Sequence, residues 1–114
     1  MEQKANQTTD GKSVLAISTV DSEQQAISIA NHLVSHKAAA CVNIVPGIRS
    51  IYRWQGAIES GQEWLLLIKT MKERVPLLQE ELRAVHHYEV PELIVIPIES
   101  GLPAYLAWIA ESVQ

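Results

Sequence analysis

The residues with the greatest chemical capacity gather in one short stretch, residues 85–92, which follows an amphipathic helical pattern. It contains two of the four histidines, His86 and His87, together with a tyrosine and two carboxylates. Imidazole nitrogens coordinate transition metals, and the other side chains add hydrogen-bonding capacity. The stretch is either a metal site or a polar turn whose histidines titrate in solvent, because adjacent histidines are a weak metal signal beside a helical HExxH motif.

The other two histidines, His32 and His36, are four residues apart in a second helical pattern. That spacing would allow one helix face to chelate a metal. Both residues fall among Asn31, Ser35 and Lys37 on the polar side of the pattern. We therefore expect them to be solvated surface histidines.

Bulk composition limits the classes of protein that need to be considered. A chain of 114 residues with 47% hydrophobic residues can form the core of one domain. The net charge of −4 argues against a basic surface for nucleic acid or anionic lipid. Cys41 is the only cysteine, which excludes an intrachain disulfide and a Cys-rich zinc site.

No stretch of the sequence approaches the roughly 18 apolar residues of a membrane span, and the N-terminal residues lack the apolar core of a signal peptide. We expect a cytoplasmic protein that does not enter a membrane. Residues 1–12 are polar and are expected to form a disordered tail. Residues 13–114 are expected to form a single domain.

Hydrophobic periodicity predicts an alternation of strands and helices between the tail and the C-terminus. Strands are expected at residues 14–17, 39–54, 63–70 and 93–98, with a bulge at Pro46-Gly47 and a turn at 55–62. Helices are expected at 22–37, 72–85 and 103–113. Ser22 or Asp21 offers an N-cap for the first helix, and Pro76 fits only the first turn of the second.

This order is that of a split βαβ unit, so we predict an α+β fold class: a ferredoxin-like βαββαβ sandwich with an extra C-terminal helix. Two helices can cover only one face of such a sheet. The aromatic residues Tyr52, Trp54 and Trp64 lie on strands, and a long hairpin leaves edges that need cover. We therefore predict a closed homo-oligomer, for which three subunits form the simplest ring.

Several segments of the sequence carry a more specific pattern. They are 39–47 (AACVNIVPG), 50–56 (SIYRWQG), Glu63 with Lys69-Thr70, 86–93 (HHYEVPEL), and Tyr105 with Trp108. In this order they resemble the CutA family of divalent-cation tolerance proteins, and the resemblance extends from Ser13 to the C-terminus. It implies a PII-like homotrimer of ferredoxin-like subunits, associated with copper and other divalent cations and with no catalytic activity.

The resemblance places the histidine of the family's His-Pro-Tyr signature at His86. His87 replaces the proline and adds a second imidazole. Cys41 matches the family's strand cysteine and is either a thiolate metal ligand or a small buried hydrophobic residue. Some members carry another cysteine, a soft ligand for Cu(I), where this chain has Ser18.

Two further groups are candidate cleft or interface residues. Tyr52 and Trp54 would line an intersubunit cleft or pack at an interface. The other group would form either a polar pocket at the base of the hairpin or a structural ion-pair network: Glu63, Lys69, Tyr88 and Glu92.

Four functions are consistent with these residues. The first is a trimeric protein that binds copper or another divalent cation through His86 and His87 and contributes to metal tolerance. The second, which is the main alternative, is a PII-like regulator that binds a small molecule between subunits. An enzyme using His86, Tyr88 and Glu92 as acid–base groups lacks a recognisable catalytic signature. The last is a purely structural trimer.

Overall fold

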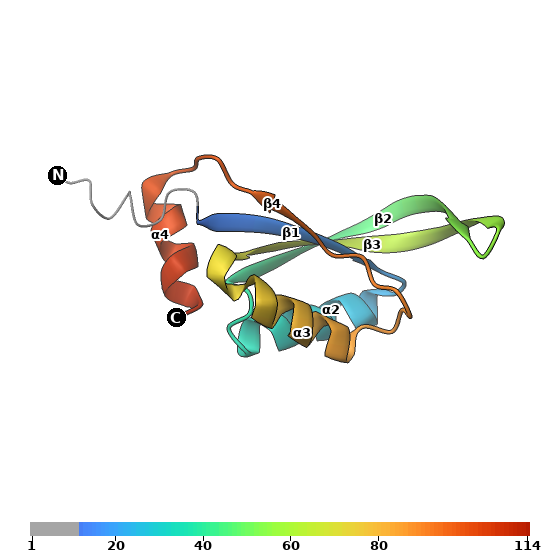
Figure 1. Ribbon diagram of the computed structural model, residues 1–114, viewed down its shortest axis with the longest axis horizontal. Helices are drawn as coiled ribbons and strands as arrows, with labels where there is room; N and C mark the ends of the chain where they lie inside the picture. Colours follow the sequence, from blue (N-terminus) through green and yellow to red (C-terminus); the bar gives the residue numbers. More distant parts are fainter. Residues whose placement is uncertain (1–11) are drawn as a thin grey trace.

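The computed structural model describes residues 12–114, which form one antiparallel sheet with three helices (Figure 1). The sheet has the strand order β2-β3-β1-β4. The strands are β1 (Ser13–Val20), β2 (Cys41–Trp54), β3 (Ala57–Met71) and β4 (Ile94–Pro97). The helices are α2 (Glu23–Ser35), α3 (Val75–Val85) and α4 (Pro103–Ser112), and a 3-10 turn, η1 (Lys72–Arg74), leads into α3. The predicted α+β class and strand arrangement are confirmed.

Residues 1–11 of the expected tail lie outside the described part of the chain. Lys12, the last residue of that expected tail, is described, and its carbonyl accepts a hydrogen bond of 2.6 Å from the Lys72 N–H. This bond extends the pairing of β1 with β3 by one residue, because Ser13 is opposite Met71.

The helix boundaries follow from local chemistry. The Ser22 hydroxyl accepts a 3.1 Å hydrogen bond from the Gln25 N–H, so Ser22 is the N-cap of α2. Pro76 lies in the first turn of α3, where its missing N–H leaves no hydrogen bond unmade. Both assignments agree with the sequence-based expectation.

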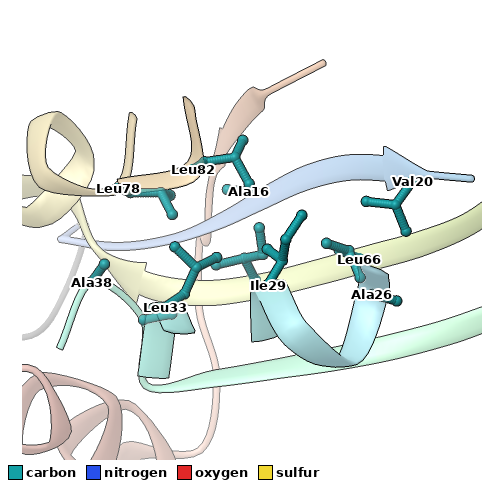
Figure 2. Packing of buried hydrophobic residues seen from close by; sticks show 11 residues of the cluster. Ala16, Val20, Ala26, Ile29, Leu33, Ala38, Leu66, Leu78 and Leu82 are labelled. Carbon is teal, nitrogen blue, oxygen red and sulfur yellow. The ribbon is translucent and has the colours of Figure 1, made fainter. Parts of the chain in front are cut away.

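The main core lies between the sheet and the helices α2 and α3, which cover the same face (Figure 1). Side chains from the two layers interlock there, with Ile29 and Leu33 of α2 and Leu78 and Leu82 of α3 packed against Leu66 of β3 (Figure 2). All five are almost fully excluded from solvent. Truncating such a leucine to alanine typically costs about 2–5 kcal/mol, so this layer fixes the positions of both helices.

The β2–β3 hairpin is longer than the sequence predicts. The turn expected at residues 55–62 is wrong: strand pairing continues to Trp54 and Ala57, and only Gln55 and Gly56 form the loop. Both loop residues have positive φ, 52° and 84°, as a tight two-residue hairpin requires. The bulge expected at Pro46-Gly47 is confirmed by the register shift between Val45 and Ile48.

The distal half of the hairpin extends beyond the helices and the other two strands (Figure 1). The molecule is accordingly elongated, with extents of 56 × 24 × 23 Å. The side chains of Ile51 and Ile58 are 71% and 70% exposed there. Large exposed apolar side chains on a projecting hairpin are candidates for contact with another molecule.

The helix α4 packs at the end of the sheet distant from the hairpin tip (Figure 1). Leu106, Ile109 and Val113 form a second buried cluster there with Ala40 and Met71. None of the helices in residues 12–114 is long and apolar enough to cross a membrane.

Among residues 12–114, no layer covers the face of the sheet opposite α2 and α3 (Figure 1). Strand alternation places on it a set of apolar side chains, which we call the open sheet face: Leu15, Ile17, Val45, Leu65, Leu67, Ile94 and Ile96. Ile94 and Ile96 are more than 40% exposed, at 52% and 44%. The sheet therefore presents two apolar faces, of which the structure covers one.

Candidate functional site

The segment between α3 and β4 crosses from the helix layer to the end of β1 (Figure 1). A cleft lies between this segment and the hairpin and is lined by residues of both. The cleft has a volume of about 520 Å³. Its walls combine three carboxylates with aromatic and hydroxyl side chains: Thr19, Ser50, Ile51, Tyr52, Trp54, Glu63, Tyr88, Glu89, Val90 and Glu92. The structure thus brings together five of the predicted site residues, Tyr52, Trp54, Glu63, Tyr88 and Glu92.

His86 anchors this segment to β1 through one ring nitrogen and bonds within the segment through the other. Nε2 lies 2.8 Å from the carbonyl oxygen of Thr19, and Nδ1 lies 3.1 Å from the backbone nitrogen of Tyr88. A carbonyl can only accept a hydrogen bond and a backbone N–H can only donate one. The neutral ring is therefore protonated on Nε2 and accepts on Nδ1.

Two further hydrogen bonds complete the wall of the cleft. The Thr19 hydroxyl donates to Glu92 at 3.4 Å, and the Tyr88 phenol donates to Oε2 of Glu63. Burial of the phenol raises the pKa of Tyr88 well above the ordinary tyrosine value, and the hydrogen bond and negative charge of Glu63 raise it further. Tyr88 is therefore a fixed donor to Glu63 at neutral pH.

His87 has a different environment from His86. Its backbone N–H donates to the side chain of Gln25 at 2.9 Å, which ties the segment to α2. Its side chain is exposed and, among residues 12–114, its ring makes no hydrogen bond. The two adjacent histidines are therefore not equivalent: His86 is held in place, and His87 is open to solvent.

Of the remaining predicted site residues, His86 and His87 do not line the cleft, and Lys69 and Cys41 lie elsewhere. Lys69 is six residues from Glu63 along β3, roughly 20 Å in an extended strand. It donates to the Asn43 side chain and lies 5.9 Å from the centre of the Tyr105 ring. Cys41 is opposite Lys69 in the sheet and is half-buried, with Sγ 3.8 Å from Oδ1 of Asn43. Neither residue approaches the cleft.

Ser18 stands where the resemblance puts a cysteine in some family members. It is fully buried on the helix-covered face, opposite Leu66. Within the described residues, its hydroxyl has no hydrogen-bond partner. Thr19, one position on, is the residue of β1 that reaches the cleft, and it was not identified from the sequence. The only signal for it was its place at the end of a buried strand.

A second histidine cluster lies on the helix layer. His32 is half-buried, and its Nε2 lies 2.6 Å from Oε1 of Glu81 on α3. The expectation that His32 is a solvated surface residue is therefore wrong; His36 is exposed, as expected. Glu81 was not predicted from the sequence. The available signal was its position next to Leu82, at the edge of the buried stripe of α3, where a polar residue meets the neighbouring helix.

Comparison with known proteins agrees with the fold. Residues 14–112 match the family model described as "CutA1 divalent ion tolerance protein". The chain is 51% identical over 94 residues to the divalent-cation tolerance protein CutA of Thermus thermophilus, covering 82% of this chain and 91% of that protein. It is 43% identical over 102 residues to the chloroplastic protein CutA of Arabidopsis thaliana, covering 90% of this chain but only 56% of that longer protein.

Solved structures give the same result. The crystal structure of CutA1 from Oryza sativa superposes with a TM-score of 0.89 at 40% identity, over 93% of this chain and 97% of that one. The Thermus thermophilus structure superposes with a TM-score of 0.85 at 48% identity, over 88% of this chain and 97% of that one. By sequence and by structure, the chain belongs to the CutA1 divalent ion tolerance family.

Proposed function

We propose that this protein contributes to divalent-cation tolerance by binding a metal ion, copper first among the candidates, at the cleft and its adjoining histidines. The observation that supports this assignment is that Glu63, Glu89 and Glu92 line one cleft, next to a segment that His86 ties to β1. Imidazole and carboxylate ligands suit Cu(II), for which affinity exceeds that for the other first-row divalent ions. The names of the relatives point the same way.

The hydrogen bonds of His86 define how a metal would enter. Coordination through Nδ1 would release the Tyr88 N–H, and coordination through Nε2 would release the Thr19 carbonyl. Within the described part of the chain, the exposed ring of His87 has no such bond to break. We therefore assign the first contact to His87 and a second, slower contact to His86. Cys41, at the other end of the sheet, would serve only a separate site for a soft ion such as Cu(I).

Native mass spectrometry with Cu(II) titration tests this assignment. We expect a His86→Ala/His87→Ala variant to bind one equivalent per chain less than the original protein. A Cys41→Ser variant should bind Cu(II) as the original does, which makes it the matched control. An unchanged number and affinity of coppers in the double variant would contradict the assignment.

We also propose that the protein is a homotrimer in which neighbouring copies cover the open sheet face. The support is the set of exposed apolar residues on that face and on the projecting hairpin, including Ile51, Ile58 and Ile94. A closed ring satisfies every copy equally, and three is the smallest such ring beyond a dimer. The cleft is lined by Ile51 and Trp54 of the projecting hairpin, so it lies next to this proposed interface.

The role that we assign is binding rather than catalysis. The groups of the cleft wall are engaged in hydrogen bonds that hold its shape, Tyr88 with Glu63 and Thr19 with Glu92. We propose the cytoplasm as its location, since a lone free thiol such as Cys41 is typical of a reducing compartment.

A further inference from the structure

His32, His36 and Glu81 form a compact group of metal-ligating side chains on the helix layer. The two histidines lie one turn apart at the end of α2, with ring centroids 4.1 Å apart, and Glu81 faces them from α3. One potential ligand atom from each residue lies within 4.8 Å of the other two. An ion bound at about 2.0–2.2 Å separates its ligand atoms by about 3–4 Å, so small side-chain rotations close the group around it.

The hydrogen bonds of the two rings determine which nitrogen of each could bind a metal. The Nδ1–H of His36 donates to the carbonyl oxygen of His32 at 2.9 Å. This bond fixes the proton of the neutral ring on Nδ1 and leaves a lone pair on Nε2, which is the arrangement that metal-bound histidines commonly have. The Nε2 of His32 points at Oε1 of Glu81. A metal ion would replace the proton between these two atoms, and that proton would leave to solvent.

The local field also favours a cation. Both histidines belong to the last turn of α2 or its C-cap, where the unpaired carbonyl groups carry partial negative charge. Glu81 adds a full negative charge from α3. The nearest lysine in sequence, Lys37, has its ammonium group held by the Gln114 carbonyl at 2.8 Å. That contact fixes the ammonium at the C-terminal end of the chain.

We propose that His32, His36 and Glu81 are a second metal site, for a divalent transition metal that imidazole and carboxylate ligate, such as zinc. Three protein ligands leave at least one position for water, so the site would exchange its ion rather than hold it permanently. It stands on its own geometry and does not depend on metal binding at the cleft. Because it lies on the helix-covered side, away from the open sheet face, it stays accessible when copies assemble through that face.

Calorimetric titration of the tagless full chain with Zn(II) tests the site. We expect His36→Ala and Glu81→Gln each to weaken one zinc equivalent per chain at least tenfold. His36 is exposed, so the alanine variant should keep the circular dichroism spectrum and zinc-free melting temperature of the original protein. Zinc should raise the melting temperature of the original protein and lose that effect in His36→Ala.

Glu80→Gln is the matched control, since it removes an exposed carboxylate next to Glu81 that belongs to neither proposed site. It should leave this equivalent of zinc in place. Failure of the original protein to bind zinc, or equal binding by His36→Ala, would overturn the site. A copper equivalent lost only in His86→Ala/His87→Ala reports on the cleft instead, so either assignment can fail while the other stands.

Discussion

The phenol of Tyr88 donates a hydrogen bond to Glu63, which joins the segment after α3 to the middle of the long strand β3. The two residues are 25 positions apart in sequence. With the contact of His86 to Thr19, this bond fixes the segment over the end of the sheet. The shape of the cleft therefore depends on a few polar contacts more than on apolar packing.

Replacing Tyr88 with phenylalanine should lower stability at neutral pH by about 1–2 kcal/mol, because the largely buried Glu63 loses its donor. The substitution also tests the raised pKa. A raised tyrosine pKa stabilises the fold fully below the unfolded value of 10.0, and that contribution is lost as the pH rises above it. The unfolding free energy, measured in urea between neutral pH and pH values above 10, should therefore fall less in Tyr88→Phe than in the original protein. Parallel curves for the two proteins would contradict the raised pKa.

Substitution of the two adjacent histidines should have unequal effects on stability. His86→Ala removes both ring contacts and leaves the Thr19 carbonyl and the Tyr88 N–H without partners, at an expected cost of about 1–3 kcal/mol. His87→Ala changes an exposed side chain and should stay within about 0.5 kcal/mol. Urea unfolding of the metal-free proteins measures the difference. Equal losses would mean that the ring contacts of His86 contribute no net stability.

A charge on the open sheet face should prevent assembly. Leu67 is paired with Ile17 on one side and Asn43 on the other, near the centre of that face. Leu67→Lys would place an ammonium group in the proposed interface, where an unpaired charge costs several kcal/mol. Light scattering after size exclusion should then give the mass of a monomer in place of a trimer. Gln79→Lys, on the exposed side of α3, is the control and should leave the mass unchanged. A monomeric original protein would refute the trimer.

The stability of the hairpin should fall when a methyl group is added at the loop glycine, Gly56, and should not fall when one is added at the strand glycine, Gly61. Gly56 has a φ of 84°, and an alanine there should cost about 1–2 kcal/mol of strain. Gly61 lies within β3 with no atom within 4 Å of the position of an added Cβ, so Gly61→Ala should be neutral or slightly stabilising. Chemical unfolding of the two variants gives the comparison. A tolerated Gly56→Ala would mean that the loop can change conformation without loss of pairing.

The element order was predictable because the helices and the central strands carry strong apolar patterns. The length of the hairpin was not. Ser60 and Gly61 have the composition of a loop, and the strand they belong to is exposed on both sides, so no alternation of buried and exposed residues marked it. Pairing with Ile51 and Ser50 is what makes this segment a strand.

The site was predictable to the extent that it is contiguous in sequence. His86, Tyr88 and Glu92 belong to one segment, and their proximity could be read directly. The position of Thr19 and the pairing of His32 with Glu81 depend on how separate elements pack. Lys69 shows the opposite case: it shares a strand with Glu63, yet the rise of an extended chain carries it to the other end of the sheet.

The first strand has a consequence for the folding of the chain. β1 lies between β3 and β4, and both of its partners come much later in the sequence: Ser13 pairs with Met71, and Val14 with Pro97. During synthesis β1 emerges first but has no neighbour until most of the chain has left the ribosome. The hairpin and the helices can form earlier, from local contacts, whereas insertion of β1 must close long loops. We therefore expect the central strand of the finished sheet to be among the last to gain its hydrogen bonds.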